Sequence, residues 1–355
     1  MRICVVSYHS SPIEPAGAGR AGGMNVFTSS LYRILGRFCE IDIFSYGNNG
    51  LTKIAPNVNI IHLDKKDLNN FAEEIVSHHT RRHYDLVHTH YWLSGIAGLF
   101  LKRSIKRPWV HTFHTIEIFK CIERDPLRIE IEEEIMRRSD LIISPTQREA
   151  SAIRTLYPDT PVITIPHGVD SNKFKAHVDG SSNLLYVGRI DPIKGLEFLI
   201  DALRILKGEF RLDIIGGPSK RQGSLENIKS YAKGLRVNFL GRIDHDELGN
   251  YYRTAAMVII PSYYESFGLI ALEAMASARP VIGFKDTGLL ETVGNDAGIL
   301  VKRSEHNLAR AVEYLLKHKN LRHKLGANGR KNISNYRWED IVRNYYDTYE
   351  NIIKN

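Results

Sequence analysis

The chain has 355 residues, of which 43% are hydrophobic and 25% charged, so its composition is that of a globular protein with about two domains. This composition excludes a disordered chain, a collagen and a coiled coil. The formal net charge of +8, from 48 Lys plus Arg against 40 Asp plus Glu, favours anionic partners such as nucleotides and sugar phosphates.

Short β-branched runs alternate with amphipathic stretches along the whole chain, and this alternation predicts parallel α/β architecture. The first series of predicted strands is Ile3–Ser7, Ile41–Ser45, Asn59–Leu63, Leu86–His88, Trp109–Thr112, Leu141–Ser144 and Val162–Ile165. The second series is Leu184–Val187, Leu212–Ile215, Val237–Leu240, Val258–Pro261, Val281–Gly283 and Ile299–Val301. We therefore expect two doubly wound domains, 1–168 and 169–335, hinged near 168–183. An aromatic-rich helix, 336–355, would cross back to the first domain.

Membrane, disulfide and nucleic-acid functions are not favoured by the sequence. The apolar stretches are far shorter than the roughly 18 residues of a membrane-spanning helix. The amino terminus is apolar only over Ile3–Val6, which predicts a first strand and not a signal peptide, so we expect a cytoplasmic protein. Three scattered cysteines without CxxC spacing argue against a disulfide framework or a zinc ribbon. The basic residues are dispersed, so no nucleic-acid partner is expected.

The loop Ser10–Asn25, after the first predicted strand, is rich in glycine. Gly17, Gly19 and Gly22 spell GxGxxG, the fingerprint of nicotinamide dehydrogenases. In that fingerprint the first glycine follows the strand almost directly, whereas here a proline-containing stretch intervenes. Gly22 and Gly23 before a helix instead let backbone amides approach a phosphate. A flexible surface loop is the alternative.

Two charged motifs lie in the second half of the chain. Arg189 and Lys194 follow a predicted strand and can converge on one anion, unless they are two exposed cations. Glu265 and Glu273 are eight residues apart, just over two helical turns. A helix starting near Phe267 can therefore direct both carboxylates to one mouth while its free amides face an anion, although a pair of surface glutamates is the commoner arrangement.

Histidines gather at two predicted strand ends, at positions 88, 90, 111 and 114. Zinc ligation is disfavoured, because no carboxylate or cysteine accompanies them at ligand spacing. His88 and His111 lie within the strands and are expected in the core. His114 and Thr115 lie where the strand should open towards a ligand, since ligands bind beyond the carboxyl ends of parallel strands.

Seven segments, in this order, resemble the family-4 retaining glycosyltransferases of the GT-B fold, in which two Rossmann-like domains face each other across a cleft. They are Gly22-Gly-Met-Asn25, His90-Tyr-Trp-Leu-Ser-Gly95, His111-Thr-Phe-His-Thr115, Pro166-His-Gly-Val-Asp170, Val187-Gly-Arg-Ile-Asp-Pro-Ile-Lys194, Gly216-Gly-Pro-Ser219 and Glu265-Ser-Phe-Gly-Leu-Ile-Ala-Leu-Glu273. Within that family the chain is most similar to the D-inositol 3-phosphate glycosyltransferases of mycothiol synthesis, and next to the sucrose-phosphate synthases.

The resemblance implies roles for individual residues. The catalytic residues would be His114, Arg189, Lys194 and Glu265. The donor-binding residues would be Gly22, Gly23, Arg189, Lys194, Glu265, Phe267, Gly268, Leu269 and Glu273. Arg189 and Lys194 would bind the donor diphosphate, and Glu273 the ribose hydroxyls. Glu265 would bind a sugar hydroxyl, with His114 beside the donor sugar. The acceptor-binding residues would be Asn25, Lys65, Tyr91, Thr115 and Arg128.

The implied reaction moves a hexose, N-acetylglucosamine or glucose, from a UDP-sugar to a small phosphorylated polyol or sugar such as inositol phosphate. The sequence shows no carboxylate for a nucleophile, so we expect front-face attack in which cations and helix amides stabilise the leaving diphosphate. No cofactor and no metal are expected. A peripheral-membrane glycosyltransferase acting on a lipid or polysaccharide is the alternative, and whether a homodimer forms stays open. A binding protein without catalysis would lack one of Arg189, Lys194 or Glu273, and all three are present.

Overall fold

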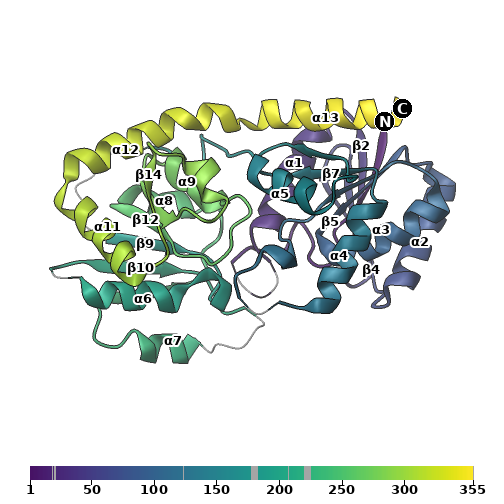
Figure 1. The fold of residues 1–355 in the computed structure, drawn as a ribbon. Helices are drawn as coiled ribbons and strands as arrows, with labels where there is room; N and C mark the ends of the chain where they lie inside the picture. Colours follow the sequence, from purple (N-terminus) through teal and green to yellow (C-terminus); the bar gives the residue numbers. More distant parts are fainter. Residues whose placement is uncertain are drawn as a thin grey trace. The chain divides into compact units, whose positions relative to one another are not determined.

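The computed structural model describes residues 1–17, 19, 21–122, 124–176, 183–206, 208–219 and 225–354 (Figure 1). The chain forms two compact units. Unit 1 consists of Met1–Glu14, Met24–Pro166 and Trp338–Asn355, and unit 2 of Pro15–Gly23 and His167–Arg337. The chain thus passes from one unit to the other between Pro166 and His167. Of the expected hinge near 168–183, residues 177–182 lie outside the described residues.

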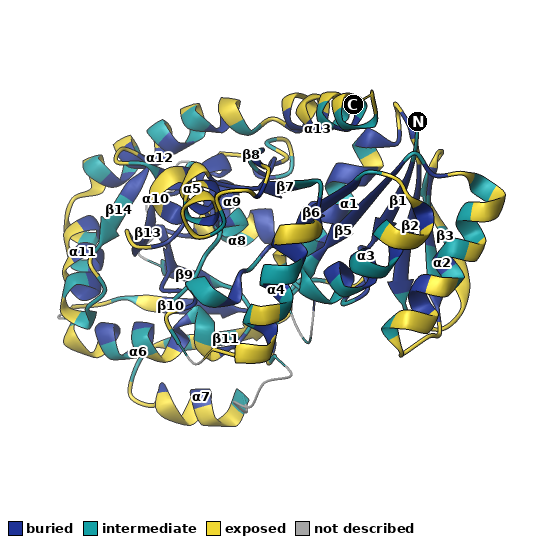
Figure 2. Ribbon diagram, turned by 45° about the vertical axis from the view of Figure 1, so that its right-hand side comes forward, coloured by how far each residue is buried: buried dark blue, intermediate teal, exposed yellow. Residues whose placement is uncertain are grey.

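Unit 1 is built on an eight-stranded sheet with the order β3-β4-β2-β1-β5-β6-β7-β8. Its strands are β1 (Arg2–Val6), β2 (Glu40–Tyr46), β3 (Gly50–Ala55), β4 (Val58–Leu63), β5 (Leu86–His90), β6 (Trp109–Thr112), β7 (Leu141–Ser144) and β8 (Val162–Thr164). Its helices are α1 (Gly23–Leu35), α2 (Leu68–Arg82), α3 (Tyr91–Ile105), α4 (Pro126–Arg138), α5 (Gln147–Leu156) and α13 (Trp338–Lys354), with a 3-10 turn, η1 (Glu117–Phe119). The central strands are dark in Figure 2, because helices cover both faces of the sheet.

The parallel architecture has one exception that the sequence did not predict. β3 pairs antiparallel with β4, whereas the other strand pairs of this sheet are parallel. β3 is an edge strand with no fully buried residue, so its sequence lacks the apolar run that identified the other strands.

Unit 2 is built on a six-stranded parallel sheet with the order β11-β10-β9-β12-β13-β14. Its strands are β9 (Asn183–Val187), β10 (Arg211–Ile215), β11 (Val237–Gly241), β12 (Met257–Ile260), β13 (Val281–Phe284) and β14 (Gly298–Val301). Its helices are α6 (Leu196–Ile205), α7 (Leu225–Tyr231), α8 (Leu248–Thr254), α9 (Leu269–Ala276), α10 (Leu289–Val293), α11 (Glu305–Lys317) and α12 (Lys319–Asn332), with 3-10 turns η2 (Pro192–Lys194) and η3 (Ile333–Tyr336). Successive residues of β9 join opposite core clusters, Leu184 in one and Leu185 in the other, so both faces of the sheet are buried.

The carboxyl-terminal helix α13 belongs to unit 1, where it packs beside α1 (Figure 1). The ring centroid of Phe27 in α1 lies 6.0 Å from that of Trp338 and 6.2 Å from that of Tyr345. The hydroxyl of Tyr349 lies 2.6 Å from His88 Nδ1 in the core. The last helix thereby completes the core around the β5 histidines.

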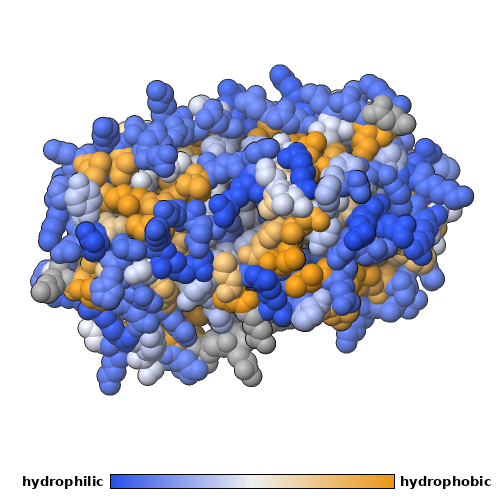
Figure 3. Space-filling view, in the orientation of Figure 1, coloured by the Kyte–Doolittle hydropathy of each residue, from blue (hydrophilic) through white to orange (hydrophobic). Residues whose placement is uncertain are grey.

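In the part of the chain that the structure describes, no helix is both long and apolar enough to span a bilayer. The face drawn in Figure 3 is covered largely by hydrophilic residues, with smaller apolar areas between them.

Candidate active site

Arg189 lies in the loop that follows β9, at the carboxyl end of the sheet of unit 2. Its Nη1 donates a hydrogen bond to the carbonyl of Gly19 (3.2 Å), and its own carbonyl accepts one from the hydroxyl of Tyr186 (3.0 Å). The side chain of Asp191 then caps η2 by accepting from the amide of Ile193 (3.2 Å). This cap fixes the turn that ends at Lys194.

Lys194 and Glu265 form a close ion pair, with 2.5 Å between Lys194 Nζ and Glu265 Oε1. The same carboxylate oxygen accepts a hydrogen bond from Ser262 Oγ (2.8 Å). The side chains of Lys194 and Glu265 are 26% and 13% exposed, so both stay accessible to a ligand. The structure therefore brings these two predicted site residues together, one as a cation and the other as a hydrogen-bond acceptor.

The helix α9 begins directly after Gly268, which has the left-handed φ of 93° that favours glycine. A Cβ at this position would lie 2.5 Å from Leu289 Cδ2, so glycine is required here for space as well. Phe267 is buried against the ring of His167, with centroids 4.7 Å apart. Among the described residues no side chain caps α9, and the amides of Ala271 and Leu272 donate to the carbonyl of Gly268. The amides of Leu269 and Ile270 remain at the helix N-terminus, where anions are favoured.

Glu273 is 4% exposed and has partners that the sequence did not identify. Its Oε1 lies 2.7 Å from His245 Nε2, and its Oε2 accepts a hydrogen bond from the hydroxyl of Tyr252 (2.7 Å). Burial and the charge of Glu273 raise the pKa of Tyr252 well above its usual value, so the phenol stays a donor. Glu265 and Glu273 therefore have separate sets of partners. The carboxylate of Glu273 is held in one orientation, with further lone pairs on each oxygen.

The glycine-rich loop is fixed to unit 2 by backbone hydrogen bonds. The amide of Gly217 donates to the carbonyl of Gly17 (2.7 Å), and the amide of Gly19 donates to the carbonyl of Pro218 (3.2 Å). A Cβ at Gly22 would lie 3.8 Å from Arg189 Nε, and one at Gly23 would lie 3.3 Å from Leu269 Cδ1. Gly22 and Gly23 thus lie beside Arg189 and Leu269, two of the predicted donor-binding residues.

Three of the predicted acceptor residues meet in unit 1. Asp125 caps α4 by accepting from the amide of Arg128 (3.3 Å), which places Arg128 in the first turn. Its Nη2 donates to both O and Oγ1 of Thr115 (2.9 Å each), and its Nη1 donates to the hydroxyl of Tyr91 (3.2 Å). The guanidinium carbon lies 4.9 Å from the centroid of the Tyr91 ring.

Arg128 differs from the expectation in one respect, because its guanidinium is already surrounded by carboxylates. Nε donates to Glu132 Oε1 (2.6 Å), and Nη1 forms an ion pair with Glu117 Oε2 (2.9 Å). Lys120 Nζ lies 2.5 Å from the same Glu117 oxygen. Glu117, Lys120 and Glu132 were not among the residues predicted for this site. Their i, i+3 and i, i+4 spacings are a signal for pairing, but spacing alone does not show burial.

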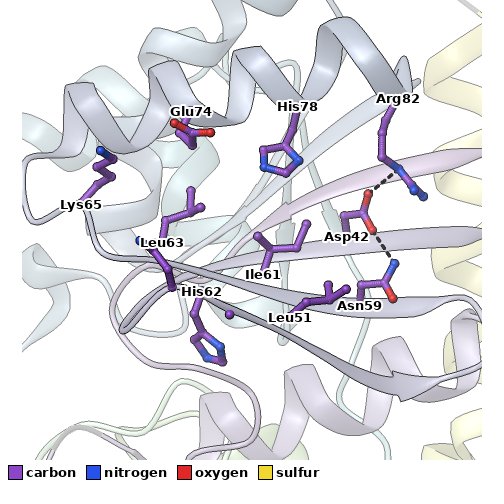
Figure 4. A pocket seen from close by; sticks show the side chains of 12 residues that line it. Asp42, Leu51, Asn59, Ile61, His62, Leu63, Lys65, Glu74, His78 and Arg82 are labelled. Carbon is purple, nitrogen blue, oxygen red and sulfur yellow. Dashed lines mark hydrogen bonds and ion pairs between the residues drawn. The ribbon is translucent and has the colours of Figure 1, made fainter.

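The other two predicted acceptor residues have different surroundings. Asn25 Nδ2 donates to Ser10 Oγ and to the carbonyl of Ser11 (2.6 Å each), so this side chain fixes the loop after β1. Lys65 is exposed and lines a pocket of about 730 Å³ between α2 and the β3–β4 hairpin (Figure 4). The residues that line this pocket are Asp42, Asn49, Gly50, Leu51, Asn59, Ile61, His62, Leu63, Lys65, Glu74, His78 and Arg82. In the described part of the chain, no hydrogen bond or ion pair joins Lys65 to Arg128, so its place in the acceptor site stays a prediction.

The histidines form a buried hydrogen-bonded chain. His114 Nε2 lies 2.9 Å from His90 Nδ1, and His90 Nε2 lies 2.5 Å from the hydroxyl of Tyr32, which is also 3.0 Å from His88 Nδ1. Burial lowers the pKa values of His88 and His114 to about 3, and it lowers that of His111 well below its usual value. The rings of His88, His111 and His114 are therefore uncharged at neutral pH.

His114 has a left-handed φ of 62°, a conformation that the surrounding contacts must hold. Through His90 and Tyr32, the orientation of its ring depends on residues of α1 and α13. Within the described ranges, no three His, Cys, Asp or Glu side chains are grouped so as to hold a metal ion.

Comparisons with known proteins place the chain in a family. The model of glycosyl transferases group 1 matches residues 168–332, and the model of Glycosyltransferase Family 4 matches residues 21–173. The D-inositol 3-phosphate glycosyltransferase of Xylanimonas cellulosilytica is 30% identical, with 99% of this chain and 97% of that protein covered. The protein of the same name from Jonesia denitrificans is also 30% identical, with 98% and 96% covered.

Solved structures agree with the fold. The sucrose-phosphate synthase of Thermosynechococcus elongatus superposes with a TM-score of 0.91 at 28% identity, with 99% of each chain covered. Anabaena HepE in complex with UDP-glucose has a TM-score of 0.83 at 18% identity and shares the fold, with 99% of this chain and 100% of that chain covered. The two Rossmann-like sheets are those of the GT-B architecture, and the chain belongs to the family-4 glycosyltransferases.

Proposed function

We propose that this chain is a retaining transferase that moves a hexose, N-acetylglucosamine or glucose, from a UDP-sugar to a small phosphorylated polyol or sugar. The observation that carries the donor half is the arrangement at the carboxyl edge of the unit 2 sheet. Arg189, the glycine pair Gly22 and Gly23, and the uncapped start of α9 at Leu269 lie together there. A guanidinium and free helix amides side by side suit a diphosphate.

This arrangement acts on the leaving group of the reaction. Negative charge develops on the UDP diphosphate as the glycosidic bond breaks, and cations placed in advance stabilise that charge without reorganising. Lys194 would exchange its ion pair with Glu265 for the diphosphate, which frees Glu265 to accept a hydroxyl of the sugar. The buried carboxylate of Glu273, oriented by His245 and Tyr252, would accept the ribose hydroxyls.

His114 is proposed as an uncharged hydrogen-bond partner of the transferred sugar. A neutral imidazole offers one donor and one acceptor nitrogen, which suits a sugar hydroxyl. A positively charged ring beside the sugar would instead repel the positive charge that develops on the sugar in the transition state. The low pKa that burial gives His114 keeps this ring neutral over the physiological pH range.

The acceptor half rests on the meeting of two hydroxyls, those of Tyr91 and Thr115, with the buried guanidinium of Arg128. Such a set suits a phosphate. The curated relatives named above act on D-inositol 3-phosphate, as their names state, and this supports a phosphorylated polyol here. Asn25 would shape the adjoining loop. We leave Lys65 out of this pocket, because it lines a different one.

The test is UDP release from a panel of UDP-hexoses with phosphorylated acceptors, their unphosphorylated counterparts, and anionic vesicles carrying lipid acceptors. Arg128→Ala should raise the KM for a phosphorylated acceptor by roughly 10- to 100-fold. That change leaves Glu117 and Glu132 without their shared cation, so Tyr91→Phe is the milder variant. It should raise the KM for the phosphorylated acceptor roughly fivefold. The matched control is Tyr84→Phe, which also loses a buried phenol hydrogen bond, to Asp42 (2.8 Å).

The outcomes separate the two acceptor classes. A raised acceptor KM in Tyr91→Phe but not in Tyr84→Phe, with donor hydrolysis unchanged in both, supports the phosphate pocket. If unphosphorylated inositol or a lipid acceptor reacts as well as the phosphorylated polyol, the small-acceptor proposal is wrong and the membrane acceptor replaces it.

A further inference from the structure

Arg128, Lys120, Glu117 and Glu132 form a buried ion cluster, each of them at most 5% exposed. Two cations face two carboxylates, so the formal charges cancel. All three guanidinium nitrogens of Arg128 already have partners. A phosphate can bind at Arg128 only if one of these partners leaves.

Glu132 is the more firmly held of the two carboxylates. Its Oε1 accepts from Arg128 Nε (2.6 Å), and its Oε2 accepts from the backbone amide of Glu117 (2.6 Å). It also lies one turn after Arg128 on the same helix, so the pair is fixed by the geometry of α4. Withdrawing Glu132 would leave a buried amide and a buried guanidinium nitrogen without acceptors.

Glu117 is held mainly by charge. Its buried Oε2 lies between two cations, 2.9 Å from Arg128 Nη1 and 2.5 Å from Lys120 Nζ. Its Oε1 accepts one long hydrogen bond, from the amide of Asp125 (3.2 Å). Glu117 lies on the short turn η1 and not on α4, so helix geometry does not fix its side chain to Arg128 as it fixes that of Glu132.

The position of Glu117 Oε2 is one that a phosphate oxygen could take. There it would lie between the same two cationic nitrogens. The hydroxyls of Tyr91 and Thr115, which accept from the same guanidinium, are close enough to turn and donate to the other oxygens. A dianion would also bring one more negative charge to the cations than the carboxylate that it replaces.

We propose that Glu117 is an internal competitor of the acceptor phosphate: its carboxylate occupies the place between Arg128 and Lys120 that the phosphate takes. This inference rests on the proposed acceptor and deepens it. In the free protein the competitor neutralises two buried cations, and on binding it gives way. The affinity for phosphate is therefore set by the exchange of two anions, and Glu117 lowers it.

The experiment is a titration of the protein with inorganic phosphate and with D-inositol 3-phosphate, at an ionic strength held constant with NaCl. Glu117→Gln keeps the shape of the side chain and removes its charge, so the Kd for phosphate should fall roughly tenfold or more. Phosphate should also raise the Tm of this variant more than that of the unmodified protein, because the anion restores the charge balance. The control is Glu130→Gln on the exposed side of α4, which should leave the Kd unchanged.

A second variant protects the test against misfolding. Glu117→Asp keeps the charge but withdraws the carboxylate by one methylene, so the Kd should fall by a smaller factor. If neither variant binds phosphate more tightly than the unmodified protein, the proposal that Glu117 competes with phosphate is wrong. Tighter binding without transfer to any phosphorylated acceptor would refute the proposed acceptor and leave the competition standing. Transfer to the phosphorylated acceptor with an unchanged KM in both variants would support the proposed acceptor and refute the competition by Glu117.

Discussion

Acidification should destabilise unit 1 through its buried histidines. His88, His111 and His114 are almost fully buried, and burial holds the pKa of each well below the value of about 6.5 that it has in the unfolded chain. Below pH 6.5 the unfolded chain therefore binds protons that the native state does not bind. The stability is complete above this pH and falls as the pH falls towards about 3, where His88 and His114 also take up protons.

The magnitude follows from linkage. A histidine that is neutral in the native state and has an unfolded pKa of about 6.5 lowers the free energy of unfolding by about 1.9 kcal/mol between pH 7 and pH 5. Three such residues give about 6 kcal/mol. Glu132 acts in the opposite direction, because burial raises the pKa of this carboxyl and favours its protonation in the native state. A variant comparison removes this opposing contribution.

The assay is urea unfolding followed by tryptophan fluorescence at pH 7 and pH 5. All three tryptophans, Trp92, Trp109 and Trp338, belong to unit 1, so the signal reports on that unit. His111→Gln should unfold more easily at pH 7, yet it should lose about 2 kcal/mol less than the unmodified protein on going to pH 5. His83→Asn, at an exposed left-handed position that asparagine tolerates, is the control. Equal losses in His111→Gln and the unmodified protein would refute the reasoning.

Three further results are expected. Alanine at Arg189 or Lys194 should lower kcat on the order of 100-fold, as loss of a charge-stabilising group does, and near-normal turnover in both variants would contradict the proposed site. Activity should survive EDTA, and a complete loss that Mg²⁺ or Mn²⁺ restores would show that a metal neutralises the diphosphate. Gly98→Ala places a Cβ 2.4 Å from the Trp109 ring and should lower the free energy of unfolding by about 1–3 kcal/mol in the urea assay. Gly50→Ala, whose nearest contact would be 3.7 Å away, should be close to neutral, so equal stability of the two variants would argue against this packing.

Most strands could be predicted from the sequence, because strands buried on both faces are nearly continuous apolar runs. β7 and β13 are examples, and the structure confirms both. β3 could not be found in this way. Its residues are exposed or half-buried at an edge, and residues such as Thr52 and Lys53 carry no apolar signal.

The backbone features of the site were also open to prediction. Gly268 is needed where the chain turns with a positive φ and Leu289 approaches closely, and such requirements are local. The partners of Glu273 could not be predicted from the sequence. His245 and Tyr252 reach its carboxylate from a loop and from α8, and only the packing of the folded unit brings them there.

The surroundings of Arg128 could be predicted only in part. Its meeting with Tyr91 and Thr115 was expected from the resemblance, and the structure brings the three together. The sequence could not show that Glu117 and Glu132 already occupy the guanidinium, because whether a nearby carboxylate pairs with an arginine depends on side-chain burial. The free enzyme therefore carries its own anions at the position where a ligand anion was expected.

The central claim is tested most directly by NMR of the reaction of an α-linked UDP-hexose with a phosphorylated polyol, in which the anomeric proton of the product and the released UDP are followed together. We expect an α-linked product formed in step with UDP, without added metal. A β-linked product, or UDP released only with free hexose in the presence of every acceptor, would contradict it.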